Sequence, residues 1–452
     1  MLKSLTLHQF RYIKPGTELK FTEHFNVLLG RNGTGKTTLL DLLSMVLRSD
    51  FSALREEEFD IEYEYTHPLG TGLVRFANKF SSLSPGTRNI GGGLGPRRIG
   101  GALGRRSEDG KPQRFQPHVV VKIRLDPTES NPELGVDVEV DGATMCWRKS
   151  GGEWETLSSV DVFKSSMLES ISDAMPFGES SIAATDEILT DYNRCGQWTY
   201  RFDESLGVFE SITESDSGRM QKPGRAPAIS LDVWFGQEKL EDPVRIVHRQ
   251  PVFVPYQYVP TRPQSGRSSA AVKLAQGSAL ANFPQLTGLR DMMMSLAVER
   301  SWQEDNENRW RFGHAEFLFS GLAGVEFSHN FLSYGQKRLL AFLYYLDANS
   351  HFIIADELVN GMHHNWIRAC LDEIGDRQSF LTSQNPLMLD YLPLESAAQV
   401  EESFIQCKSE VVGETTQLVW SNLSTEDAEE LFADYQVGIQ HVGEILRVRG
   451  LW

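Results

Sequence analysis

The sequence is poor in cysteine and has no long apolar run. Its 452 residues hold four scattered cysteines (Cys146, Cys195, Cys370 and Cys407) and no C-x-x-C pair. A zinc knuckle and a disulfide framework are therefore not expected. No stretch of about 18 apolar residues could span a bilayer, and the N-terminus lacks the apolar segment of a signal peptide. We expect a cytoplasmic protein without a membrane partner.

Basic residues are also scarce, with 44 Lys and Arg against 61 Asp and Glu, which gives a net charge of −17. The surface is therefore not expected to coat DNA, because phosphate binding needs clustered cations. The exception is the Gly/Arg-rich segment 84–116, where seven basic residues and two acidic ones give a local charge of +5. We interpret this segment as a flexible loop. One possibility is a solvated insertion without a partner. The alternative is a segment that contacts nucleic acid, including DNA, or an acidic protein.

The chain does contain a phosphate-binding motif, at the centre of residues 25–43. Gly30, Gly35, Lys36 and Thr37 fall at the G-x-x-x-x-G-K-[ST] spacing, after an apolar run and before an apolar-periodic segment. Glycines let successive backbone N–H groups point at phosphate oxygens, and the following helix adds the positive end of its dipole. Lys36 would reach the β- and γ-phosphates, and Thr37 would hold Mg²⁺.

A second group of candidate residues lies near the C-terminal end. Ser333 is placed to cap a helix, with Gln336 three residues later at the capping-box spacing. An apolar strand ends in Asp356 and Glu357. Because neighbouring strand residues point to opposite sides, Asp356 can lie beside Mg²⁺ while Glu357 polarises the attacking water. A further strand over 378–383 leads to Gln384, at a strand end near the γ-phosphate.

Together these segments resemble the Walker A, signature, Walker B and switch elements of ATP-binding-cassette (ABC) ATPases; they are residues 30–37, 332–336, 352–357 and 382–386. More narrowly, residues 8–12 resemble the N-F-R strand of the RecF/SMC/OLD-like branch. Residues 356–363 resemble the D-E-x-x-N-G-x-H segment of that branch. The resemblance covers roughly residues 1–50 and 320–395.

The resemblance implies an α/β fold, an ABC-type P-loop NTPase sheet with helices and a large α+β insertion between the Walker A and signature motifs. The implied domains are an ATPase domain split over 1–50 and 270–452 and an inserted region at 51–269. The implied ligands are ATP and Mg²⁺. The implied partner is a second copy in a head-to-tail dimer, in which Ser333 and Gly335 contact the γ-phosphate bound by the other subunit and residues 360–363 cross the interface.

The resemblance also assigns roles residue by residue. Nucleotide contacts fall on Arg11, Gly30, Asn32, Gly33, Gly35, Lys36, Thr37, Thr38, Ser333, Gly335 and Gln336. Catalytic roles fall on Glu357, Lys36 and Gln384, and metal binding falls on Thr37 and Asp356. Gln384 departs from the family, which usually has His there; Gln cannot carry a switchable charge but can donate an amide hydrogen bond, so slow hydrolysis is expected. Gln257 is the candidate for a Q-loop.

Two functional interpretations remain open. No heptad seam long enough for a coiled-coil arm is present, and about sixty residues follow Asp390, which is too few for a typical nuclease domain. The chain resembles the stand-alone ATPase subunits of bacterial antiphage systems such as Septu, PARIS and ATPase-bearing retrons, which control a separate effector, frequently a nuclease. The alternative is a RecF-like ATPase of DNA repair or recombination.

Hydrophobic periodicity predicts the remaining elements. Strands are expected over 3–9, 18–29, 59–65, 73–80, 118–125 and 135–140, and a β-rich stretch over 197–259. Helices are expected over 36–48, twice within 160–193, and over 286–300, where Met292, Met293 and Met294 would fill the core. Residues 262–269 are expected to form a linker, and residues 301–308 to be exposed.

Overall fold

The computed structural model describes the chain in ranges separated by gaps. These are residues 1–48, 50–67, 70–82, 113–125, 136–141, 144–149, 155–159, 231–235, 243, 245–248, 255, 258–264, 268–304, 307–349, 351–383, 387–413, 415–437 and 441–449. The helices predicted within 160–193 and most of the basic segment 84–116 lie outside these ranges. Among the described helices, none has the length and apolar character needed to cross a membrane.

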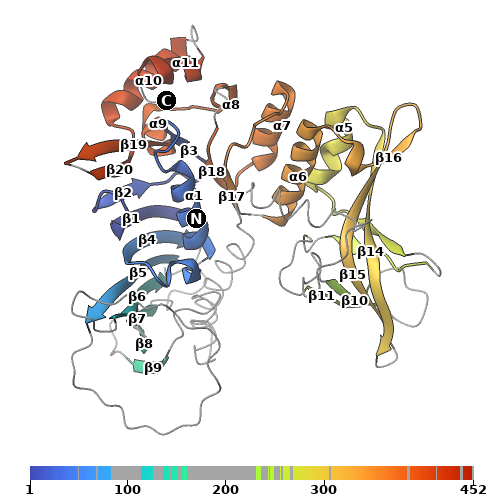
Figure 1. The fold of residues 1–452 in the computed structure, drawn as a ribbon, viewed down its shortest axis with the longest axis horizontal. Coiled ribbons are helices and arrows are strands. Elements are labelled where there is room, and N and C mark those ends of the chain that lie inside the picture. Colours follow the sequence, from blue (N-terminus) through green and yellow to red (C-terminus); the bar gives the residue numbers. More distant parts are fainter. Residues whose placement is uncertain are drawn as a thin grey trace.

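A central sheet carries the polar strand ends predicted from the sequence (Figure 1). Its order is β17 (Phe352–Ala355), β18 (Gln378–Leu381), β3 (Phe25–Leu29), β19 (Phe404–Val412) and β20 (Thr415–Asn422). The first four strands run parallel, and β20 returns antiparallel to β19. The C-terminal ends of β17, β18 and β3 therefore meet at one edge of the sheet, where α/β proteins bind ligands.

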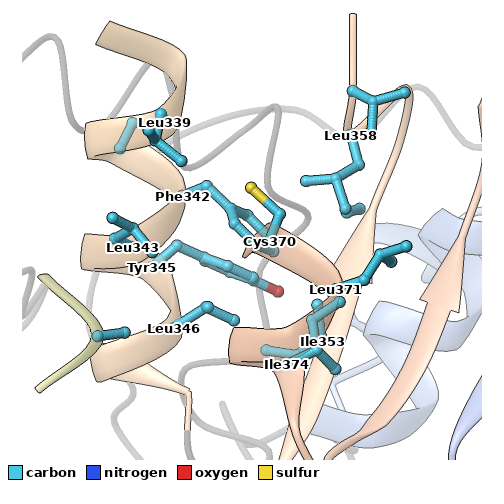
Figure 2. Packing of buried hydrophobic residues seen from close by; sticks show 14 of the residues in the cluster. Leu339, Phe342, Leu343, Tyr345, Leu346, Ile353, Leu358, Cys370, Leu371 and Ile374 are labelled. Atoms are coloured by element: carbon cyan, nitrogen blue, oxygen red, sulfur yellow. The ribbon is translucent and has the colours of Figure 1, made fainter. Parts of the chain in front are cut away.

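Strands β17, β18 and β3 of the central sheet are buried almost throughout, as expected for parallel strands with continuous apolar sequence. On one face, Val27 and Ile353 join the core that includes helices α6 (Tyr334–Ala348) and α7 (His364–Ile374). On the other face, Leu28 and Ile354 join the core that includes α1 (Lys36–Arg48). Figure 2 shows the first face, where Phe342, Leu343 and Leu346 of α6 approach residues of α7 and β17.

Helix α1 shares its core with a second, antiparallel sheet. The order in that sheet is β2 (Thr17–Lys20), β1 (Leu2–Phe10), β4 (Phe59–His67), β5 (Gly70–Ser82), β6 (Gln113–Leu125), β7 (Val136–Asp141), β8 (Thr144–Lys149) and β9 (Glu155–Ser159). Residues 42–47 of α1 are all buried, and all of them except Ser44 are apolar, so this half of the helix can pack between the two sheets.

A third sheet packs on the α6 side of the molecule. Its order is β11 (Arg245–His248), β10 (Leu231–Phe235), β15 (Glu307–Ser320), β14 (Asp291–Glu304), β13 (Ser269–Lys273) and β12 (Val259–Pro260), and β16 (Glu326–Ser328) also pairs with β15. Helix α5 (Phe283–Thr287) precedes β14. The long β14–β15 hairpin extends beyond the helices in Figure 1.

Short helices complete the described part of the chain. They are α8 (Leu387–Asp390), α9 (Ala397–Ser403), α10 (Thr425–Val437), α11 (Val442–Val448) and 3₁₀ turns at Ser52–Leu54, Ala279–Asn282 and His329–Phe331. Asp390 Oδ1 accepts a hydrogen bond from the Val442 N–H at 2.8 Å, so α8 caps the start of α11.

The predicted α/β class is confirmed, as are helix 36–48 and most predicted strands. Two expectations are wrong. The strand expected over 18–29 is two strands in different sheets, β2 and β3, because the chain turns between them. That turn is held by buried Asn26, whose Oδ1 accepts from the Thr22 N–H at 2.8 Å.

The helix expected over 286–300 is also wrong, since α5 ends at Thr287 and β14 begins at Asp291. Gly288 ends the helix in a left-handed conformation, with φ 71°. Beyond Gly288 the buried apolar side chains repeat every two residues, as in a strand, and not every 3.6 residues, as in a helix. Met294 and Leu296 are buried, whereas Met293 between Met292 and Met294 is 49% exposed. Residues 301–304 likewise belong to β14, with Ser301 and Gln303 exposed.

The predicted domain boundaries at residues 50 and 270 stay a prediction. Strand β4 pairs with β1, and β10 pairs with β15, so residues on both sides of each boundary share sheets.

Candidate functional site

The phosphate loop, residues 30–37, connects β3 to α1 and depends on glycine at two close approaches. A Cβ on Gly30 would lie 2.2 Å from the backbone oxygen of Cys407, and a Cβ on Gly35 would lie 2.8 Å from Leu418 Cδ1. Gly30, Gly33 and Gly35 also have positive φ, at 141°, 85° and 85°. The chain can curl this tightly only where side chains are absent.

Cys407 lies behind the loop and adds no charge to it. Burial raises the pKa of its thiol to about 12, so the neutral form persists at physiological pH. The loop therefore faces no thiolate that would repel a phosphate.

Lys36 folds back over the loop that precedes it. Its Nζ donates hydrogen bonds to the backbone oxygens of Gly30 at 2.6 Å and Arg31 at 3.1 Å. The ammonium group thus lies within reach of the loop interior. The first N–H groups of α1 point the same way and cannot be satisfied inside the helix. Positive charge and free donors are what an anion-binding site requires.

The loop meets the end of β17 through a hydrogen bond between side chains 319 residues apart. Thr37 Oγ1 donates to Asp356 Oδ2 at 2.8 Å. The other oxygen of that carboxylate accepts from Thr382 Oγ1, just after β18. A hydroxyl and a carboxylate beside a phosphate loop are hard oxygen ligands of the kind that Mg²⁺ takes. The residues present therefore fit Mg²⁺ and a nucleotide.

Glu357, next to Asp356, has an unusual backbone conformation. Its φ of 49° is left-handed, which costs a residue other than glycine about 1–3 kcal/mol and needs support from its surroundings. Its N–H donates to Thr382 Oγ1 at 2.9 Å, and its Oε2 accepts from Asn360 Nδ2 at 3.3 Å. Strain of this kind gathers at functional sites.

Ser333 caps α6 as predicted. Its Oγ accepts from the Gln336 N–H at 3.3 Å, and Gln336 Oε1 accepts from the Ser333 N–H at 3.0 Å, which completes a capping box. Phe331 and Tyr334, on either side of this cap, are 80% and 65% exposed. Two large apolar side chains are therefore exposed within three residues of each other, next to the cap.

The structure separates these residues into two groups. Lys36, Thr37, Asp356 and Glu357 gather around the carboxyl edge of the central sheet. Ser333 stands at the start of α6, which packs on the opposite face of that sheet from α1.

Arg11 lies in a turn held against β20, where Leu418 donates its N–H to Tyr12 O at 2.8 Å. Its guanidinium makes two hydrogen bonds to the Glu57 carboxylate, at 2.7 and 2.8 Å, and this contact raises the pKa of Arg11. Leu418 also touches the Gly35 position, so the turn lies beside the phosphate loop although the Arg11 side chain is turned to Glu57.

The remaining predicted residues lie on the phosphate loop, at the start of α1 or outside the described ranges. Asn32 and Gly33 are exposed on the loop, and Thr38 is half-buried at the start of α1. Gln384 and Gln257 lie outside the described residues. Arg338, which contacts the backbone of Glu357, was not identified from the sequence because nothing local distinguishes it from other basic residues on a helix.

Comparison with known proteins gives one family match. Residues 4–81 match the model of a family described as an AAA domain, and this range contains the phosphate loop and α1. The match supports an ATPase-type nucleotide-binding domain in this part of the chain. No curated protein matches the sequence.

Solved structures with a similar arrangement are SMC head domains. One, from Thermotoga maritima, has 11% identity and a TM-score of 0.32, over 93% of this chain and 99% of that chain. Another is an Smc head domain with an extended coiled coil, bound to the C-terminal domain of ScpA and derived from Pyrococcus furiosus. It has 10% identity and a TM-score of 0.34, over 96% and 99% of the two chains.

Proposed function

We propose that the chain binds ATP with Mg²⁺ and hydrolyses it at a site completed by a second copy of the chain. The observation that carries this proposal is the 2.8 Å hydrogen bond from Thr37 to Asp356, which joins the phosphate loop to an acidic strand end. That pairing places a hydroxyl and a carboxylate, both oxygen ligands of the kind that Mg²⁺ takes, beside the phosphate loop.

The backbone N–H groups of residues 31–37 would bind the phosphates, and Lys36 would exchange its two carbonyl partners for phosphate oxygens. Thr37 and Asp356 would hold the metal. Bound Mg²⁺ would neutralise negative charge on the β- and γ-phosphates. Glu357 would accept a hydrogen bond from the attacking water and take its proton as a general base.

The surface around Ser333 supports a nucleotide site built from two copies of the chain. Ser333 caps α6, the helix that packs on the face of the central sheet opposite α1, and lies beside exposed Phe331 and Tyr334. A head-to-tail dimer would bring this surface of one copy against the nucleotide of the other, with Ser333 and Gly335 at the γ-phosphate. Burying two aromatic side chains would stabilise such an interface, because apolar area removed from water contributes about 25 cal/mol per Å².

We further propose that nucleotide-gated assembly controls a separate effector protein, as in the antiphage ATPase subunits that the sequence resembles. The analogy in architecture to those subunits supports this role. Purification from the native host tests it. A nuclease that copurifies only when Lys36 is intact would support effector control, whereas copurifying DNA and no protein would favour a repair ATPase.

Phosphate release from ATP tests the hydrolytic function. Wild type should hydrolyse ATP in the presence of Mg²⁺, while Lys36→Ala should lose nucleotide binding. Glu357→Gln should bind ATP but turn it over about a hundredfold more slowly. Lys3→Ala is a matched control, because Lys3 makes an exposed ion pair with Glu23 at 3.4 Å and should not affect turnover. If Glu357→Gln hydrolysed ATP at the wild-type rate, Glu357 would not be the general base.

A further inference from the structure

Arg338 belongs to α6, but its guanidinium contacts the segment that follows β17. Its Nε donates to the backbone oxygen of Leu358 at 3.0 Å. Its Nη2 donates to the backbone oxygens of Glu357 at 2.5 Å and Asp356 at 3.4 Å. Arg338 is only 6% exposed. Three consecutive carbonyl groups therefore face one buried guanidinium.

Carbonyl dipoles that converge on one point repel each other unless a donor stands between them. Arginine suits this position, because its planar guanidinium carries five N–H donors in a fixed arrangement and stays protonated. Lysine would bring one compact charge without the planar fork. The contact therefore depends on the shape of the side chain as well as its charge.

Arg338 also secures the strained backbone of Glu357. The Glu357 N–H donates to Thr382 at the end of β18, and its carbonyl oxygen accepts from Arg338 and from the Asn360 N–H at 3.1 Å. Both peptide groups flanking the left-handed Cα are thus fixed, and with them the direction in which the Glu357 side chain leaves the backbone.

The start of α6 contacts the same segment a second time. A Cβ on Gly335 would lie 2.7 Å from the backbone oxygen of Gly361, and a Cβ on Gly361 would lie 2.8 Å from the Tyr334 ring. A displacement of the first turn of α6 would therefore reach residues 356–361 through both Arg338 and these contacts, because packed interiors transmit strain.

We propose that Arg338 is a positioning residue for Glu357, holding its strained backbone and tying its orientation to the first turn of α6. The inference rests on the proposed function, which gives Glu357 the attacking water and gives Ser333, on the same turn, the nucleotide of the second copy. Contact of α6 with that nucleotide would then set Glu357 in its own subunit for hydrolysis.

The test separates turnover from binding in the full chain. Arg338→Gln should lower kcat by about tenfold or more, because small displacements of a catalytic group cost rate steeply. Its Kd for ATP should stay within about twofold of wild type, because the shorter hydrogen bonds of Arg338 hold Glu357 and Leu358, while the carboxylate of Asp356 is held by Thr37 and Thr382. The kcat of Arg338→Lys should fall between those of wild type and Arg338→Gln. Arg368→Gln is the control, since Arg368 is exposed on α7 and lies 3.9 Å from Asp372.

Hydrogen exchange supplies a readout that a general loss of stability would not mimic. In Arg338→Gln, amides of residues 357–363 should exchange faster while those of α1 stay as in wild type. A kcat within about twofold of wild type would overturn the inference, and so would equal losses of kcat and affinity with faster exchange throughout. If Arg338→Gln does not fold, Arg338→Lys is judged by the same criteria.

The positioning role of Arg338 and the proposed function can be tested separately. If Glu357→Gln slows turnover about a hundredfold and Arg338→Gln leaves it unchanged, the positioning role alone is wrong. If Glu357→Gln leaves turnover unchanged, the proposed function and the positioning role are both wrong.

Discussion

Thr37 and Asp356 are 319 residues apart in the chain and are joined by a 2.8 Å hydrogen bond. One begins the helix after the phosphate loop, and the other follows a buried strand of the central sheet. The sheet order brings them together, since β3 and β17 both pair with β18 and run in the same direction. The long segment between them in the chain therefore leaves the nucleotide-binding edge intact.

Gly30→Ala should abolish ATP binding. The new Cβ would lie 2.2 Å from the Cys407 carbonyl oxygen, so the loop would have to move. Gly413→Ala is the matched control, because Gly413 also has positive φ, at 65°, but has no atom within 4 Å of an added Cβ. We expect titration calorimetry with ATP and Mg²⁺ to detect binding in wild type and Gly413→Ala only. Normal affinity in Gly30→Ala would contradict the loop geometry.

Asp347→Ala should destabilise the fold. The buried carboxylate accepts from Tyr258 Oη at 2.5 Å and Ser278 Oγ at 2.5 Å, and from the N–H groups of Ala279 at 2.8 Å and Leu280 at 3.2 Å. Removing it leaves buried donors without acceptors, which should cost about 3 kcal/mol or more.

Denaturant unfolding checks this expectation. Asp372→Ala is the control, because Asp372 is exposed and pairs with Arg368 at 3.9 Å, so a change of less than about 0.5 kcal/mol is expected. Equal stability of Asp347→Ala and Asp372→Ala would contradict the role of the buried carboxylate.

Stability should fall at alkaline pH. Burial, together with the nearby Asp347 charge, raises the pKa of Tyr258 and of Tyr344 well above the ordinary value. A raised pKa means that the folded state favours the neutral phenol. This preference stabilises the folded state fully below about pH 10, the pKa of tyrosine in the unfolded chain. The stabilisation is lost as pH rises towards the higher pKa of the folded state. The free energy of unfolding should decline above about pH 10, and less steeply in Tyr258→Phe. Identical slopes in both proteins would exclude Tyr258 as a contributor.

Phe331→Ser should weaken ATP-dependent assembly without affecting nucleotide binding. Phe331 is 80% exposed beside the Ser333 cap, so its loss removes apolar area from the proposed interface and no core contact. Val411→Ser is the control, because Val411 is 78% exposed on β19, away from that cap. Light scattering with ATP in the Glu357→Gln background should show a larger species in the control only. Assembly by Phe331→Ser as in wild type would place the interface elsewhere.

Sequence alone was sufficient to predict structural features that depend on local spacing. The phosphate loop, the Ser333 capping box and the acids after β17 each occupy a short segment whose chemistry follows from its own residues. The apolar stretch around Met293 was misread because a short apolar run fits both periods, and its strand character depends on pairing with β15.

Other features follow from distant contacts. Arg11 is held by Glu57, and Arg338 reaches residues about twenty positions further along the chain, so neither contact could be predicted from local sequence.

Mixing two inactive variants tests the composite site most directly. Lys36→Ala removes the phosphate-binding side chain, and Ser333→Arg blocks the cap that should face the other copy. Each variant alone should be inactive, but a mixed dimer contains one site with both Lys36 and Ser333 intact. ATP turnover of an equal mixture should recover to about a quarter of the wild-type rate, as random pairing in a symmetric dimer predicts. A mixture no more active than its separate components would contradict a site shared between two copies.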